Sequence, residues 1–229
     1  MAHYDIIVVG GGLSGAAAAI SASRMGKRVC LVEKYNCLGG AAAYDLVLPF
    51  MYSYTMVDGK RDQLTCGLFL EIKKRLKELG GLNESWDDCF SGEHLKLVLN
   101  RMAIESGVNL LFQAYLTDVS YKDGILYDID IHSPDGEGTS HHYFKDGEYY
   151  QIPYRALIPR NTKNLLVTGR CIGADHEAQA SLRIMPTCTA LGQASGVALA
   201  LCHSCGATTT ELSVRELQDA LLETGARID

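Results

Sequence analysis

The sequence predicts an α/β fold in which helices flank a parallel β-sheet, and three observations support this prediction. An apolar run at residues 6–9, which we expect to be a fully buried strand, is followed by a glycine-rich turn and by a helix of small residues at 16–24. A second apolar run, residues 28–32, ends in Glu33. After further helical segments, residues 108–112 form a third predicted strand. Strands that alternate with helices in this way are typical of a parallel sheet.

The glycine-rich turn predicts the binding of a dinucleotide. Residues 10–15 fit the pattern G-x-G-x-x-G, between the first strand and the first helix. Gly10 allows the tight turn, Gly12 lets the backbone approach a pyrophosphate, and Gly15 lets the helix pack closely on the strand. The helix N-terminus offers free N–H groups to the phosphates. Glu33, at the end of the second strand, is placed to accept a hydrogen bond from a ribose hydroxyl. This arrangement is typical of a Rossmann-like fold.

The remaining helices follow from apolar periodicity and from glycine or proline at their ends. Residues 67–79 predict an amphipathic helix that two glycines end. A long helix rich in alanine and glycine is expected to begin at Pro186, a favourable residue for the first turn of a helix. A short buried strand is predicted at 165–167. The other predicted helices span residues 91–105 and 214–223, and the long helix runs to residue 202.

A small antiparallel β-meander is predicted within residues 120–150. Apolar and polar residues alternate along 125–132, which is typical of a strand with two different faces. The Pro- and Gly-containing stretch 133–138 predicts a turn, and residues 141–144 and 148–152 are candidate returning strands.

The composition of the chain limits the classes of function. The 229 residues, 47% apolar and 21% charged, suit one globular domain, and the net charge of −6 argues against nucleic acid or an anionic membrane as a partner. No signal peptide is evident, and we expect no uninterrupted apolar run to approach the length of a membrane span. The eight cysteines have no regular spacing, which favours reduced thiols and a cytoplasmic location.

Residues 152–200, taken together with the first glycine motif, resemble the FAD-dependent oxidoreductase family, whose FAD domain is similar to that of glutathione reductase and fumarate reductase flavoproteins. The resemblance covers residues 4–120 and 149–227. It implies FAD as the cofactor, held at its pyrophosphate by the first motif and at its ribityl chain and ring by segments 168–170 and 183–187. The residues that it implies for cofactor binding are Gly10, Gly12, Leu13, Ser14, Gly15, Glu33, Lys34, Gly39, Gly40, Ala41, Leu116, Gly169, Arg170, Met185, Pro186 and Thr187.

The resemblance also gives the segment after residue 170 a chemical role. The positive end of the helix that begins near Pro186 would stabilise negative charge on a reduced flavin by about 1–2 kcal/mol. His176 is a candidate proton donor, and Arg183 a candidate anchor for a carboxylate or for the flavin O2 atom. A structural ion pair of Glu177 with a basic residue is an equally open interpretation.

The middle of the chain departs from the family that it resembles. Full-length relatives carry an inserted substrate domain, whereas this chain has only the short segment 120–150 there. We therefore expect a single FAD-binding domain over residues 1–229, which is either naturally minimal or an engineered or deletion-derived form. Apolar surface left without the inserted domain would favour a homo-oligomer.

Three functions remain open from the sequence. The first is an FAD-binding oxidoreductase whose flavin accepts a hydride from a small organic substrate and passes electrons to a redox partner. The second is a minimal FAD-binding module that needs a partner or cap domain for turnover. The third is a dinucleotide-binding enzyme similar to thiazole synthases.

The cysteines and histidines outside these motifs predict no metal site. Residues 202–205 have C-x-x-C spacing but lie at the end of the last long helix, and Cys171 and Cys188 are interpreted as packing residues. Cys37 is a candidate neighbour of the cofactor, but it has no C-x4-C partner, so we expect no redox disulfide there. His132, His141 and His142 are expected to be solvated because no cysteine or acid completes a ligand pattern around them.

Overall fold

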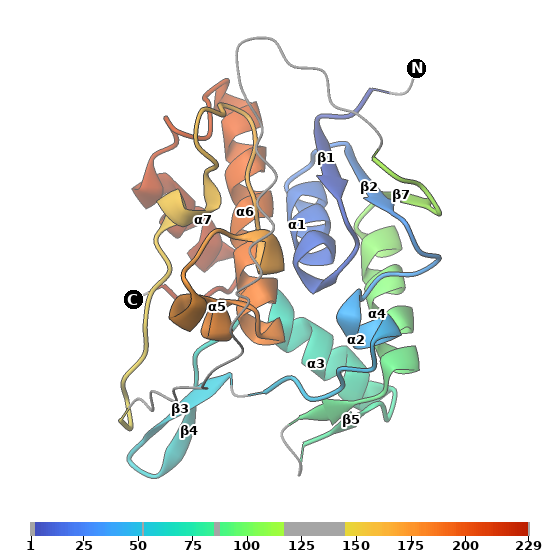
Figure 1. The fold of residues 1–229 in the computed structure, drawn as a ribbon, viewed down its shortest axis with the longest axis vertical. Coiled ribbons are helices and arrows are strands. Elements are labelled where there is room, and N and C mark those ends of the chain that lie inside the picture. The colour runs from blue at the N-terminus through green and yellow to red at the C-terminus, as the bar shows by residue number, and fades with distance from the viewer. Residues whose placement is uncertain (1–2, 52, 85–87, 117–144, 229) are drawn as a thin grey trace.

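A parallel sheet, with three strands among the described residues, forms the centre of the fold. The computed structural model describes residues 3–51, 53–84, 88–116 and 145–228. Strands β1 (Ile6–Val9), β2 (Val29–Glu33) and β7 (Asn109–Phe112) lie in the order β1-β2-β7, and both pairings are parallel. The predicted strands and the predicted parallel arrangement are confirmed (Figure 1).

Two helices connect these strands and cover one face of the sheet. Helix α1 (Leu13–Arg24) joins β1 to β2, and α4 (Gly92–Glu105) precedes β7. The apolar side chains of Val29 and Leu31 are fully buried in one cluster with residues of both helices. Ser91 caps α4 by accepting a hydrogen bond from the backbone N–H of His94, so the helix begins where the sequence predicts.

The other face of the sheet is largely exposed, which corrects the prediction of a fully buried first strand. Ile7, Val9 and Leu111 have exposed fractions of 62%, 53% and 51%. The β1–β2 and β2–β7 registers place their side chains on the same face, opposite Ile6 and Leu31. Among the described strands, β1 is at the edge of the sheet, and its apolar run does not imply burial on both sides.

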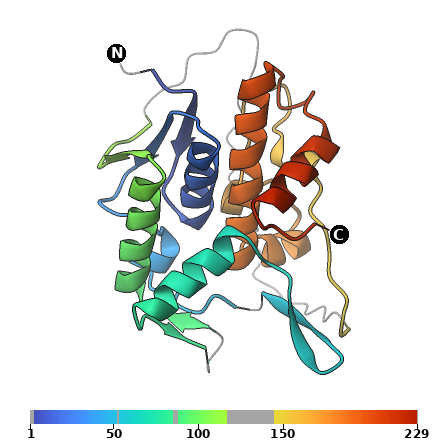
Figure 2. The same ribbon diagram turned by 180° about the vertical axis from the view of Figure 1, so that it is seen from behind.

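Helix α6 (Met185–Cys205) is the longest element and lies between α1 and α7 (Val214–Glu223) (Figures 1 and 2). By length and composition, α6 alone among the described helices could span a membrane, which differs from the expectation that no apolar run approaches that length. However, 67% of its most apolar window is buried inside the fold. Its packing is that of a core helix.

Smaller elements that the sequence analysis did not predict complete the fold. Two antiparallel hairpins flank α3 (Leu68–Glu78), itself a predicted helix. The hairpins are β3 (Tyr54–Val57) with β4 (Lys60–Gln63) and β5 (Leu82–Asn83) with β6 (Cys89–Phe90). The short helices are α2 (Ala41–Tyr44), α5 (His176–Leu182), and the 3₁₀ turns η1 (Tyr154–Leu157) and η2 (Gly169–Cys171).

Two predicted strands are wrong. Residues 165–167 form no strand, because Val167 makes a single backbone hydrogen bond to Leu157 (2.8 Å) where a ladder would need several. Residues 148–152 also form no strand and pair with no described strand. The rest of the predicted meander, with His132, His141 and His142, lies outside the described residues.

Candidate dinucleotide site

The first glycine turn has the backbone geometry that its sequence predicts. Gly10 has a φ of +97°, which favours glycine, and its N–H donates to the carbonyl of Val32 (2.8 Å). A Cβ atom on Gly15 would lie 1.8 Å from the carbonyl oxygen of Gly10. Glycine at position 15 therefore lets α1 approach β1 more closely than any other residue would.

Gly12 borders open space at the N-terminus of α1. A Cβ atom added to Gly12 would meet nothing within 4 Å, and no side chain caps this helix end. The first hydrogen bond of α1 runs from the Ala16 N–H to the Gly12 carbonyl (2.8 Å), so the N–H groups of Leu13, Ser14 and Gly15 precede it. The N-terminus of α1 therefore offers free N–H groups and a partial positive charge next to open space, and both favour the binding of a pyrophosphate.

Glu33 holds the glycine turn through a hydrogen bond to its backbone. Its carboxylate is buried, with a 6% exposed fraction for the residue, and accepts hydrogen bonds from the N–H groups of Gly11 and Tyr35. An ionised carboxylate has about four acceptor positions, so some remain for a ribose hydroxyl. The sequence predicts the position of this acid, but not its bonds to the turn.

The turn at residues 38–40 lies directly against the first glycine turn. The N–H of Gly39 donates to the Gly11 carbonyl (2.8 Å), and a Cβ on Gly40 would lie 2.9 Å from Cα of Gly12. Gly40 has a φ of +53°, and Ala41 begins α2 directly after it. The side chain of Asn100, which sequence reasoning missed, accepts from the Leu38 N–H (3.2 Å).

The second motif, far away in sequence, meets the first at Ser14. The hydroxyl groups of Ser14 and Thr168 are 2.9 Å apart, although 154 residues separate them along the chain. A Cβ on Gly169, whose φ is +70°, would lie 2.8 Å from Cβ of Ser14. Arg170 follows with an exposed side chain. The structure therefore brings together the two segments that the resemblance assigns to one cofactor.

Helix α6 runs parallel to α1 and extends past its N-terminus. Cβ atoms on Gly192 and Gly196 would lie 2.1 Å and 2.2 Å from the carbonyl oxygens of Ser14 and Ala18. Both pairs advance in the same direction, so both N-termini point to the same end of the molecule. Met185 begins α6 seven residues before Gly192, which places the N-terminus of α6 about 10 Å beyond the level of Ser14.

The start of α6 has no side-chain cap. Its N-cap residue is Ile184, and the buried ring of Pro186 lies in the first turn, followed by Thr187. Free N–H groups at this end provide a second partial positive charge, beyond that of α1.

The other predicted site residues lie around this core. His176 and Arg183 are both exposed and mark the two ends of α5, about 10 Å apart along its axis. The Lys34 ammonium lies 4.7 Å from the centre of the Tyr35 ring. Leu116 follows β7 and is 56% exposed.

Two groups, Tyr44 and Cys188, keep their protons at neutral pH. Burial, and then a hydrogen bond from the Cys37 thiol (3.2 Å), raise the pKa of Tyr44 to about 12. Burial also raises the pKa of the Cys188 thiol to about 11. The described cysteines are all free, and no group of three or more His, Cys, Asp or Glu among the described residues could hold a metal ion.

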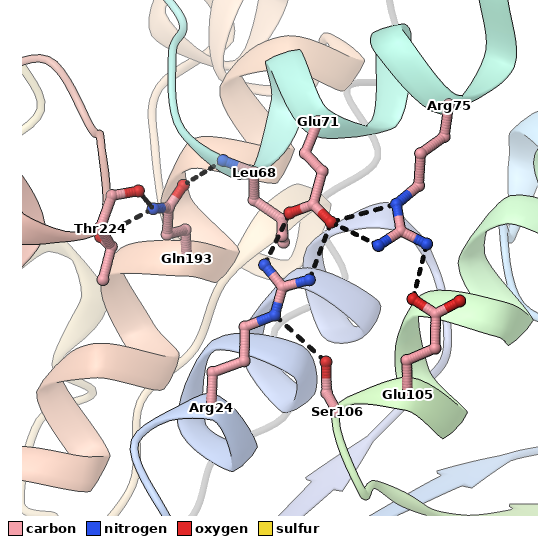
Figure 3. A network of polar contacts seen from close by, with 8 residues as sticks. All are labelled: Arg24, Leu68, Glu71, Arg75, Glu105, Ser106, Gln193 and Thr224. Atoms are coloured by element: carbon pink, nitrogen blue, oxygen red, sulfur yellow. Dashed lines mark hydrogen bonds and ion pairs between the residues drawn. The ribbon is translucent and has the colours of Figure 1, made fainter. Parts of the chain in front are cut away.

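A cavity of 150 Å³ lies away from the glycine turns, near the other end of α1. Arg24 and Glu71 in its lining form a bidentate ion pair (2.6 and 2.9 Å), and Arg75 joins Glu71 to Glu105 (Figure 3). The hydrogen bond from Arg24 and its charge lower the pKa of Glu71. The ion pairs join α1, α3 and α4, and because these polar groups bond one another, we interpret this region as a structural junction.

Comparison with known proteins identifies the family. The sequence model of the family described as FAD dependent oxidoreductase matches residues 5–126 and 124–221, which together make up most of the chain. The chain belongs to this family, and its cofactor is FAD.

Individual relatives match only parts of the chain. The soluble pyridine nucleotide transhydrogenase of Chromohalobacter salexigens is 40% identical over 47 residues, which are 20% of this chain and 10% of that protein. The chain thus matches about a tenth of the length of this relative. Among solved structures, Thermovibrio ammonificans THI4 has a TM-score of 0.31 at 19% identity, covering 48% of this chain and 38% of that chain. The L-amino acid deaminase of Proteus vulgaris has a TM-score of 0.33 at 19% identity, covering 54% and 43%.

Proposed function

We propose that this member of the FAD dependent oxidoreductase family transfers a hydride from a small organic substrate to FAD bound across the N-termini of α1 and α6. The observation that carries the proposal is the parallel contact of these helices at Ser14 and Gly192, with the start of α6 about 10 Å beyond. A dinucleotide held at its pyrophosphate by α1 would thereby extend its ring toward α6.

Each helix end has a separate task in this proposal. When bound, FAD supplies N5 of its ring as the hydride acceptor. The N–H groups that follow Gly12 hold the pyrophosphate, and Glu33 holds both the turn and the ribose. The N-terminus of α6 favours negative charge near N1 and O2 of the ring by about 1–2 kcal/mol.

His176 and Arg183 complete the proposed site at its open side. We assign proton donation to His176 and the binding of a substrate carboxylate, or of the flavin O2 atom, to Arg183. Their exposed side chains at the two ends of α5 are free to meet a ligand that enters from solvent. The assignment rests on exposure and on the position of α5 before α6.

We further propose that residues 1–229 form one FAD-binding domain in which 120–150 replace a larger substrate domain. The family match supports this because it divides at residues 124–126, within that segment. The same observation favours the second candidate, a minimal FAD-binding module whose turnover needs a cap from another chain. The exposed sheet face with Ile7 and Val9 would then favour a homo-oligomer.

Purified protein tests these proposals directly. We expect a yellow protein with flavin absorbance that dithionite bleaches, and a small organic donor, found in a broad panel, that reduces the flavin anaerobically. If flavin is bound but no donor reduces it, turnover by the chain alone is refuted and the minimal FAD-binding module remains as the candidate function. A colourless protein that carries another adenine dinucleotide, identified by mass, would refute the flavin site and favour a thiazole-synthase-like enzyme. The free thiols are the basis for proposing a cytoplasmic location.

A further inference from the structure

We infer that Leu46, Val47 and Met51 form an apolar wall that binds the hydrophobic part of the substrate. The substrate is thereby assigned to the organic molecules that carry an aliphatic or aromatic portion beside the group that gives up the hydride. This inference rests on the proposed function and adds to it the class of substrate. It concerns contacts with the substrate and requires no contact of these residues with FAD.

Three apolar side chains are exposed within one short loop between α2 and β3. Leu46, Val47 and Met51 have exposed fractions of 69%, 46% and 44%. Single exposed apolar residues are common on protein surfaces, whereas several of them together mark a surface that contacts a ligand or another protein. These three side chains therefore call for an occupant.

The backbone of this loop is strained at two of the three residues. Leu46 and Met51 have φ values of +54° and +64°, in the left-handed region that favours glycine, asparagine and aspartate. The other non-glycine residues with positive φ in the described part of the chain are all aspartate, asparagine or glutamine. A leucine and a methionine in this conformation cost stability, and strained positions of this kind gather at ligand-binding sites.

A buried aromatic residue holds the loop in place. Phe50 is fully buried, with its ring stacked on that of Phe90 (4.1 Å between ring centres) and edge-on to that of Phe69 (5.2 Å). The carbonyl of Leu48 accepts a hydrogen bond from the Phe90 N–H (3.1 Å). The loop is thus anchored to the core between its exposed residues, so it presents them on a fixed backbone.

The position of the loop points to the substrate as the occupant. The Val47 N–H donates to the carbonyl of Ala41 (3.4 Å), at the start of α2. Ala41 directly follows Gly40, which lies against Gly12 in the first glycine turn. The segment from α2 toward β3 then crosses the end of the molecule at which α1 and α6 begin (Figures 1 and 2). The loop is therefore continuous with the FAD site, at the end where the substrate must meet the ring.

The test measures how the affinity of ligands depends on the length of their hydrocarbon chain. We would titrate the oxidised FAD-bound protein with straight-chain alcohols and with straight-chain carboxylates of increasing length, and follow the absorbance spectrum of the flavin. In the wild type, the dissociation constant is expected to fall about two- to fourfold for each added CH₂ group. Because the two series differ in their head group, a slope common to both reports contact with the chain.

Substitutions of similar size remove the apolar surface and preserve the fold. Leu46→Asn introduces a residue that tolerates positive φ, Val47→Thr keeps the branched shape, and Met51→Gln keeps the length of the side chain. The triple variant should retain its flavin and its thermal unfolding midpoint, but the dependence on chain length should disappear. Leu222→Asn and Ile104→Thr, at exposed sites in α7 and α4, are matched controls and should keep the wild-type slope.

Each outcome decides the inference. A triple variant that keeps the slope, or a wild type without one, overturns the inference and leaves the FAD site in place. If the wild type sediments as a dimer and the triple variant as a monomer, the occupant is a second copy of the chain, which also overturns it. If the triple variant loses its flavin, Leu46→Asn alone is measured in the same way, and a reduced slope is expected. A wild type that binds no flavin refutes the proposed function as well.

Discussion

Replacing Gly12 with alanine separates the binding role of the first glycine turn from its structural role. Gly12 has φ and ψ of −62° and 175°, a conformation open to any residue, and its added Cβ would contact no protein atom within 4 Å. The apoprotein should therefore tolerate the change. Its free energy of unfolding should change little, because the gain of about 0.4–1 kcal/mol from a restricted unfolded chain is offset by the lower preference for alanine at the N-cap position.

The affinity of Gly12→Ala for FAD, in contrast, should fall. The new methyl group would occupy the open space beside the first N–H groups of α1, where the pyrophosphate is proposed to lie. A phosphate displaced from one such N–H loses a charge-assisted hydrogen bond of about 1.5–3 kcal/mol, or about 10- to 150-fold in affinity. The dissociation constant is measured by the quenching of flavin fluorescence, and apoprotein stability by urea unfolding followed by circular dichroism.

Gly15→Ala is the matched comparison within the same motif. Its Cβ would lie 1.8 Å from the carbonyl oxygen of Gly10, a main-chain atom that cannot rotate away. Overpacking outweighs the gain of about 1 kcal/mol in helix propensity, so apoprotein stability should fall by about 2 kcal/mol. If Gly12→Ala bound FAD as tightly as the wild type, or if it destabilised the apoprotein as much as Gly15→Ala, the assignment of the two glycines would be refuted.

Three further predictions concern packing and charge. Gly192→Ala should lower the free energy of unfolding by about 2 kcal/mol in urea, since its Cβ would lie 2.1 Å from the Ser14 carbonyl; unchanged stability would contradict the close helix contact. Hydrogen bonds from Arg28 lower the pKa of Asp5 from 3.8 to about 2, so its stabilising effect is present above about pH 4 and is lost as the pH falls toward 2. Asp5→Asn should therefore flatten the dependence of the unfolding midpoint on pH between 4 and 2, and an unaltered slope would refute this. At pH 8, iodoacetamide should label the exposed Cys171 but not the buried Cys188, whose pKa is about 11, as peptide mass spectrometry would show; rapid labelling of both would disprove the burial.

Local patterns in the sequence predicted much of the fold. Helix α7 has the predicted bounds, and α3 and α4 end at glycine-containing turns as expected, because apolar periodicity and capping residues act within a few residues of each other. One hairpin was missed although its signal was present. Asp58 and Gly59, both at positive φ (49° and 72°), form the turn between β3 and β4, a dipeptide typical of tight hairpins.

Other features depend on neighbours that are remote in sequence. The apolar run of β1 indicates a strand but not how many of its faces are covered, so the exposure of Ile7 was not predictable. In the site, the sequence indicated Glu33 and the glycines, while the hydroxyl pair of Ser14 and Thr168 joins segments 154 residues apart.

The contact between α1 and α6 determines where two partial positive charges lie relative to each other. Gly192 and Gly196 each face a main-chain carbonyl of α1, so sliding α6 by one turn would place larger side chains against that backbone. Such a slide would also move the N-terminus of α6 by about 5.4 Å, roughly half of its offset from α1. The glycines of α6 therefore fix the spacing between the pyrophosphate end and the ring end of the proposed site, although neither glycine needs to touch the cofactor. Binding and packing are coupled here through the register of two helices, and this coupling explains why a helix without Asp, Glu, Lys or Arg belongs to the site.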